Sequence, residues 1–222
     1  MIIIKKLEEP QELKRVREEF LQDYLSYFHY DDEKYTKVEK MPDSIKSKYN
    51  ISAVKELLVK ETFGKCAYCE SKIMHIAFGD IEHILPKIHR PDLVFEWDNF
   101  TLACEQCNRK RKKDYYSISE PLINPYSENP LEFFVAAGPM IMPKLGSHRG
   151  YITQQLLELN REELHEKRKE KIEDIQPLLD SWVQADGKHK DVLERALLKY
   201  IDPSKEFSFI IKGYYKLQGI PC

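Results

Sequence analysis

The sequence lacks a membrane-spanning segment, a nucleotide-binding loop and a strong excess of basic residues. No apolar run approaches the roughly 20 residues of a membrane helix, and the apolar stretch at residues 1–4 is too short for a signal peptide. No Gly-x-x-x-x-Gly-Lys-Ser/Thr loop occurs, so ATP is not bound in that way. The formal net charge is only −2, so any attraction to phosphate must be local. We expect a cytoplasmic protein without a membrane segment.

Cysteine is scarce but placed in a regular pattern. Four of the five cysteines form two Cys-x-x-Cys pairs, Cys66/Cys69 and Cys104/Cys107, with 34 residues between the pairs. Four thiolates in this spacing suit a tetrahedral zinc, which leaves no open position on the metal and is therefore structural. Disulfides are the alternative, but a reducing compartment disfavours them. A single redox-active pair does not explain why there are two. The fifth cysteine, Cys222, is expected to be a free thiol.

The segment between the pairs carries the residues suited to catalysis. Asp80-Ile81-Glu82-His83 alternates, so in an extended strand Asp80 and Glu82 share one face and His83 points to the other. An imidazole suits a general base at neutral pH. Carboxylates and the amide of Asn108 are hard oxygen ligands of the kind that hold Mg²⁺ or Mn²⁺ beside a phosphate. A buried structural histidine is the alternative interpretation of His83.

These residues resemble the HNH, or ββα-metal, endonuclease family. Glu82-His83 is similar to the acidic-His pair of its first strand, Asn99 to its middle Asn, and Asn108 to its last. The resemblance implies that His83 activates the attacking water, that Glu82 and Asn108 bind the catalytic Mg²⁺ or Mn²⁺, and that Asn99 holds the loop that orients His83. Glu stands where Asp is more usual. Because the longer side chain moves the carboxylate, Asp80 is an alternative or second metal ligand.

A run of cations follows Asn108 on the expected α element of the ββα motif. Phosphate contacts from such residues give sequence-independent affinity for nucleic acid. A solvated, charge-rich helix is the alternative interpretation. The candidate nucleic-acid-binding residues are Arg109, Lys110, Arg111, Lys112 and Lys113.

The resemblance extends over roughly residues 50 to 170. Further motifs, such as Leu122-Ile123-Asn124-Pro125 and Leu159-Asn160, resemble the HNH nuclease subunits of Septu-type anti-phage systems and their retron-associated relatives. That resemblance implies a partner, an ABC- or SMC-like ATPase, and a nucleic-acid substrate, with DNA favoured over RNA. A zinc-stabilised binding module that does not cut and an RNA-cleaving toxin acting on tRNA are the two alternatives.

The expected fold class is α+β, with a ββα-metal HNH module and a four-cysteine structural zinc embedded in a mostly helical chain. The predicted divisions are an N-terminal helical region at 1–62, a zinc-stapled HNH module at 63–116, a loop and hairpin linker at 117–150, and a C-terminal helical region at 151–222. Composition agrees, because 42% hydrophobic residues are enough for a core.

Local patterns predict the individual elements. Apolar spacing and turn residues indicate the helices and a hairpin across Gly138. Gly64 is expected to end the helix at 52–62, and Asn160, followed by Glu163, is expected to cap the helix that it begins. Phe209 and Tyr215 fall off the apolar stripe of the last helix, so they are candidates for a protein-binding surface, with core as the alternative. The expected elements are a strand at 2–4, helices at 10–27, 52–62, 151–159, 160–185 and 191–200, a hairpin of 131–135 with 140–142, a last helix after 204, and a loop with a short helix at 31–50.

Overall fold

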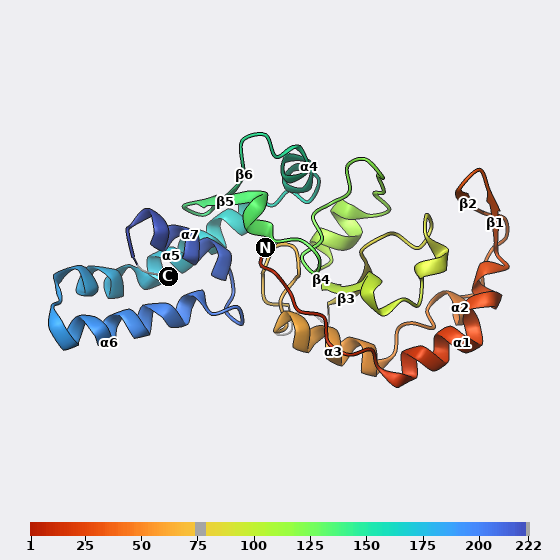
Figure 1. The fold of residues 1–222 in the computed structure, drawn as a ribbon, viewed down its shortest axis with the longest axis horizontal. Helices are drawn as coiled ribbons and strands as arrows, with labels where there is room; N and C mark the ends of the chain where they lie inside the picture. Colours follow the sequence, from red (N-terminus) through yellow and green to blue (C-terminus); the bar gives the residue numbers. More distant parts are fainter. Residues whose placement is uncertain (74–78, 221–222) are drawn as a thin grey trace. The chain divides into compact units, whose positions relative to one another are not determined.

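The computed structural model describes residues 1–73 and 79–220 (Figure 1). Cys222, expected to be a free thiol, lies outside these ranges. The chain forms two compact units, one of residues 1–3, 67–72 and 122–222, and the other of residues 4–66 and 73–121. Most of the predicted N-terminal region and most of the predicted zinc module therefore share the second unit.

The fold class is α+β, as predicted, with helix content of 48% and strand content of 12%. The sheets found in the described residues are all two-stranded and antiparallel. Among the same residues, no helix is both long and apolar enough to cross a membrane.

The second unit begins with three helices and a hairpin. Its elements are α1 (Gln11–Leu25), β1 (Phe28–Asp31), β2 (Lys34–Lys37), α2 (Asp43–Lys46) and α3 (Ser52–Thr62). Helix α1 starts after Pro10, as predicted, and buries Leu13 and Tyr24. The predicted strand at residues 2–4 is wrong, because that segment pairs with no other strand in the described part of the chain. The β1–β2 hairpin was not predicted, because its turn residues Asp32 and Glu33, both with positive φ, lack the usual turn glycine.

Helix α3 delivers the chain into the first cysteine pair. Phe63 adopts a left-handed conformation with φ of 55°, and Gly64 follows with φ of 69°. The Gly64 amide donates to the Val59 carbonyl at 2.8 Å, which closes the helix end. Both the predicted bounds of this helix and its termination at Gly64 are confirmed.

The central elements of the second unit follow the ββα order. Strand β3 (Asp80–His83) pairs with β4 (Phe100–Ala103), with His83 opposite Phe100 and Asp80 opposite Ala103. Two short 3-10 turns, η1 (Pro91–Leu93) and η2 (Trp97–Asn99), lie between the strands. The α element is η3 (Gln106–Lys112), a π-helix that starts within the second cysteine pair. The wider π turn suits a functional segment.

The other unit contains a hairpin and four helices. Its elements are η4 (Pro130–Glu132), β5 (Phe134–Ala137), β6 (Met140–Pro143), α4 (His148–Leu156), α5 (Glu162–Gln184), α6 (Gly187–Leu198), η5 (Lys199–Ile201) and α7 (Ser208–Leu217). The predicted hairpin is confirmed, with Gly138 at positive φ in its turn. Asn160 does not cap α5 as predicted. Its side chain instead bonds the backbone of Ile141 at 2.8 Å in both directions.

The core of this unit forms where α7 packs on α5 and α6, which lie side by side in Figure 1. Arg168 is fully buried on α5 and donates to the Leu159 carbonyl at 2.6 Å. Phe209 and Tyr215 are buried, so the hypothesis that they form a protein-binding surface is wrong. The Tyr215 hydroxyl donates to the Leu197 carbonyl, which gives the off-stripe tyrosine a place inside the core. The buried core residues are Ile175, Leu179, Leu197, Ile211, Tyr215 and Ile220.

Candidate active site

The four paired cysteines come together as predicted. The Sγ atoms of Cys66, Cys69, Cys104 and Cys107 all lie within 4.8 Å of one another, and none of the four is in a disulfide. Zn–S bonds of about 2.3 Å place tetrahedral sulfurs roughly 3.8 Å apart. Four thiolates that are mostly buried repel one another unless a cation neutralises them. The donor set therefore fits a structural zinc, and it joins the end of α3 to the start of η3.

Strand β3 divides the candidate catalytic residues between two sides. Asp80 and Glu82 contact the π-helix η3, whereas the His83 ring packs against Tyr49 and Phe100. This is the alternation expected of a strand. The result is a carboxylate side that faces the cationic helix and an imidazole side enclosed by aromatic rings.

His83 is held by one hydrogen bond and two aromatic rings. Its Nε2 lies 3.0 Å from the Val94 carbonyl oxygen, so the tautomer that fits carries its proton on Nε2 and leaves the lone pair on Nδ1. The Tyr49 and Phe100 rings meet the imidazole edge to face at 4.6 and 4.9 Å between centroids. Burial first, and the Lys87 ammonium second, lower the pKa of His83 from its ordinary 6.5 to about 3. The ring is therefore neutral near pH 7.

Asn99 fixes the loop that follows β3. Its Oδ1 accepts from the Leu85 amide at 2.8 Å, and its Nδ2 donates to the Leu85 and Leu93 carbonyls at 3.0 and 3.2 Å. Because the Asn99 side chain is buried, water competes only weakly for these bonds. Leu93 immediately precedes Val94, so the same side chain sets both the exit of the catalytic strand and the segment that carries the partner of His83.

Glu82 forms a buried ion pair. Its Oε1 lies 2.5 Å from the Lys112 Nζ, and only 2% of the Lys112 side chain is exposed. The Lys112 ammonium also donates to the His83 carbonyl oxygen at 2.9 Å. Burial raises the pKa of Glu82, and the Lys112 charge opposes that rise. Lys112 therefore ties the last turn of η3 to the two central residues of the motif.

Asp80 and Asn108 are adjacent at the other end of β3. The Asp80 Oδ2 accepts from the Asn108 Nδ2 at 3.2 Å and from the Arg109 Nε at 2.9 Å. Of the candidate metal ligands, these two side chains are the pair brought into direct contact. Both carboxylates of β3 thus carry a cationic partner, because Arg109 pairs with Asp80 and Lys112 with Glu82.

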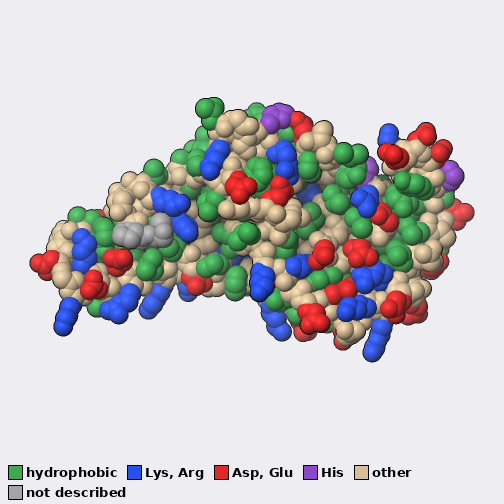
Figure 2. All heavy atoms as spheres, in the orientation of Figure 1, with side chains coloured by type: hydrophobic (Ala, Val, Ile, Leu, Met, Phe, Trp, Pro, Cys, Tyr) green, Lys and Arg blue, Asp and Glu red, His purple; other side chains and the backbone are tan. Residues whose placement is uncertain are grey.

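The five cations of η3 and its end do not share one surface. Arg109 and Lys110 are exposed, and Lys110 lies 3.7 Å from Glu105. Arg111 is half-buried and donates to the Gln106 Oε1 at 2.6 Å. The assignment of Lys112 to a phosphate-binding surface is corrected, because its ammonium is buried against Glu82. On the face visible in Figure 2, basic and acidic side chains are interspersed, consistent with the small net charge.

Tyr49 is a site residue that the sequence did not indicate. It lies between α2 and α3, outside every motif, and reaches the site through its ring contact with His83. Its hydroxyl accepts a hydrogen bond from Lys87 at 2.6 Å. A single tyrosine in a polar segment carries no local pattern that could have singled it out.

Comparison with known proteins matches part of this chain to one family. The HNH endonuclease family matches residues 66–114. A Septu protein PtuB of Bacillus mycoides (strain KBAB4) is 31% identical over 58% of this chain and 54% of its own length. A Septu protein PtuB of Bacillus thuringiensis is 37% identical over 35% of this chain and 30% of its own length. The chain thus spans about half, or less, of the length of these curated relatives.

The family match begins at the first cysteine of the cluster and ends just after η3. It therefore encloses both cysteine pairs, the β3–β4 hairpin and the π-helix. Residues 66–114 form a domain of the HNH endonuclease family.

Proposed function

We propose that this protein is a metal-dependent endonuclease that hydrolyses phosphodiester bonds of nucleic acid. The observation that carries the proposal is the neutral His83 at the end of a short strand that also carries two carboxylates, one of them bonded to Asn108, within a stretch that matches the HNH family. A neutral imidazole and hard oxygen ligands are the two parts that hydrolysis of a phosphodiester requires.

His83 would act as the general base. Its Nε2–H is committed to the Val94 carbonyl, so Nδ1 takes the proton of the attacking water. Asn99 positions this pair indirectly, through the backbone at Leu85 and Leu93. The imidazole does not need to lose a proton first, because burial keeps it neutral at neutral pH.

Asn108 and a carboxylate of β3 would hold the divalent cation, Mg²⁺ or Mn²⁺. Glu82 is the ligand implied by the family, with Asp80 as the alternative or second ligand. Direct contact of Asp80 with Asn108 supports a contribution from Asp80. A flipped Asn108 amide would present its oxygen on the side where its nitrogen now meets the carboxylate. The bound ion would supply charge neutralisation at the phosphate and the leaving oxygen. Arg109 neutralises the Asp80 carboxylate, and Lys112 neutralises that of Glu82.

We place the protein in a bacterial anti-phage system, as the effector of an ABC- or SMC-like ATPase. Support comes from the two relatives named Septu protein PtuB. The substrate we propose is DNA rather than RNA, acted on in the cytoplasm. Exposed cations at η3, Arg109, Lys110 and Lys113, would contact the phosphate backbone.

A binding module without cleavage is the second candidate. The Glu82–Lys112 ion pair favours it, because an ammonium already neutralises the family's metal carboxylate. Activity on RNA is a variant of the first candidate, since the same base and the same metal ligands would serve a substrate with or without a 2′-hydroxyl.

The test compares wild type with His83→Ala on plasmid DNA and total tRNA, in Mg²⁺ or Mn²⁺, with and without the co-encoded ATPase. His29→Ala is the matched control, because His29 is exposed on β1 in the same unit. Zinc content is matched among the three proteins. Loss of cleavage in His83→Ala alone supports the mechanism, and the substrate consumed separates DNA from RNA. Equal cutting by all three refutes the role of His83, whereas binding without cutting supports the second candidate.

A further inference from the structure

Lys87 stands next to the catalytic histidine without a carboxylate partner. Its Nζ donates to the Tyr49 hydroxyl at 2.6 Å and lies 4.6 Å from the centroid of that ring. Among the described residues of the second unit, the lysines Lys6 and Lys112 each pair with a glutamate. Lys87 makes no ion pair with any described carboxylate. Its ammonium is held by the Tyr49 hydroxyl and remains available to an anion.

The position of Lys87 is set by rigid neighbours. Lys87 follows Leu85 by two residues, and Leu85 is fixed on both its amide and its carbonyl by Asn99. Pro86 begins a turn in which its carbonyl accepts from the amides of His89 and Arg90. The loop that carries Lys87 is therefore anchored by the same asparagine that anchors the strand exit at His83.

Tyr49 connects this lysine to the general base. Its ring meets the His83 imidazole at 4.6 Å with an angle of 88° between the planes, while its hydroxyl holds the Lys87 ammonium. Tyr49 also contacts the Phe100 ring at 5.7 Å, so three aromatic and imidazole rings fix one another. The Lys87 Nζ and the centroid of the His83 ring each lie 4.6 Å from the centroid of the Tyr49 ring.

We propose that Lys87 binds a non-bridging phosphate oxygen of the nucleic-acid substrate beside the scissile bond, and that Tyr49 is the positioning residue that aims it there. This deepens the function proposed above and rests on it. An ammonium with no carboxylate partner among the described residues, fixed beside the imidazole, is the donor that a phosphate oxygen next to the attacked phosphorus requires. Lys87 acts by contact, whereas Tyr49 acts through Lys87.

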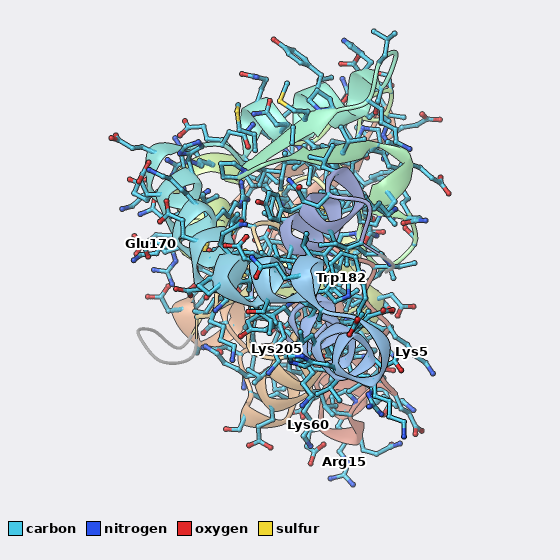
Figure 3. All side chains as sticks on the ribbon, turned by 90° about the vertical axis from the view of Figure 1, so that its left-hand side faces the viewer. Lys5, Arg15, Lys60, Glu170, Trp182 and Lys205 are labelled. Atoms are coloured by element: carbon cyan, nitrogen blue, oxygen red, sulfur yellow. The ribbon has the colours of Figure 1, made fainter. Side chains whose placement is uncertain are left out.

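The first experiment measures single-turnover cleavage of plasmid, with the ATPase present, for Lys87→Gln, Lys87→Arg, Tyr49→Phe and the double variant Tyr49→Phe/Lys87→Gln. Lys60→Gln is the matched control, because Lys60 is an exposed lysine on α3 in the same unit (Figure 3). Loss of one charge-assisted contact lowers the rate roughly 10- to 100-fold in Lys87→Gln. Lys87→Arg keeps the charge and recovers most of that loss. The double variant is no slower than Lys87→Gln, because Tyr49 acts through the same lysine.

The second experiment needs no turnover and uses binding to a fluorescent DNA duplex in a His83→Ala background. One phosphate contact contributes about 0.9 to the slope of log affinity against log salt. The slope should therefore become shallower by about 1 in Lys87→Gln and stay unchanged in Lys60→Gln. Thermal melting of each variant checks that the fold is kept.

The outcomes separate this inference from the proposed function. If Lys87→Gln cuts and binds like wild type while His83→Ala is inactive, the nuclease stands and the role of Lys87 is refuted. If the losses in cleavage rate caused by Tyr49→Phe and Lys87→Gln multiply in the double variant, Tyr49 does not act through Lys87. If wild type neither cuts nor binds any nucleic acid in a salt-dependent way, both proposals fail.

Discussion

Replacement of Lys112 by methionine tests the buried ion pair at the centre of the HNH domain. Methionine keeps much of the length and the apolar stem of lysine and removes the ammonium. The change takes away the partner of the Glu82 carboxylate at 2.5 Å and the donor to the His83 carbonyl at 2.9 Å. Both acceptors belong to buried residues, so water does not replace the lost contacts.

Removal of one partner of a buried pair costs about 3–5 kcal/mol, because the other charge is left unpaired. The orphaned His83 carbonyl adds about 1 kcal/mol or more. Protonation of Glu82 relieves part of this cost. Without Lys112 the folded-state pKa of Glu82 lies still further above its unfolded value. The folded protein then keeps this proton to a higher pH than the unfolded chain does, so its stability falls as pH rises between the two pKa values. The deficit of the variant is therefore larger near pH 8 than near pH 5.5.

The measurement is the free energy of unfolding in urea, with zinc saturating for every protein. Lys110→Met is the matched control, because Lys110 is exposed on the same helix and its pair with Glu105 is worth less than about 1 kcal/mol. The double variant Glu82→Met/Lys112→Met should recover most of the stability, because neither charge remains. This account of the pair would be refuted if Lys112→Met lost no more unfolding free energy than Lys110→Met at either pH.

Three further outcomes are expected. Cys107→Ser lowers the bound zinc measured by atomic emission and the melting temperature together, since three thiolates hold the ion less tightly; unchanged zinc content would contradict the four-cysteine site. Asn99→Ala breaks three hydrogen bonds of a buried side chain and lowers the free energy of unfolding by about 2–4 kcal/mol. In plasmid cleavage it lowers kcat more than it changes KM, and an effect on KM alone would count against its positioning role. The pKa of His83 is about 3 in the folded protein and 6.5 in the unfolded chain, so stability falls as pH drops below 6.5, by about 1.4 kcal/mol per pH unit. Urea unfolding of wild type and His83→Gln at equal zinc content checks this, and identical pH slopes would show that His83 is not buried in its neutral form.

Local sequence determined the parts of this protein that depend on near neighbours. Paired Cys-x-x-Cys spacing predicted the thiolate cluster, because a short turn brings its two sulfurs to one side. Helix α3 and its end at Gly64 followed from apolar spacing and a residue that tolerates positive φ. The order of acidic-His pair, Asn99 and Asn108 predicted the HNH domain through its resemblance to that family, because the motif is read directly from residue types and their order.

Contacts between distant segments decided the rest. Lys112 is one of five consecutive cations, and only the packing of η3 on β3 buries it against Glu82 while Arg109 stays exposed. Phe209 and Tyr215 lie off the apolar stripe of α7 yet are buried, because more than one side of that helix is covered. Tyr49 reaches His83 across 34 positions of sequence, a contact that no local period encodes. The sequence alone therefore determined which chemical groups are present, and the tertiary structure decided which charges meet, because burial and pairing depend on residues that are remote along the chain.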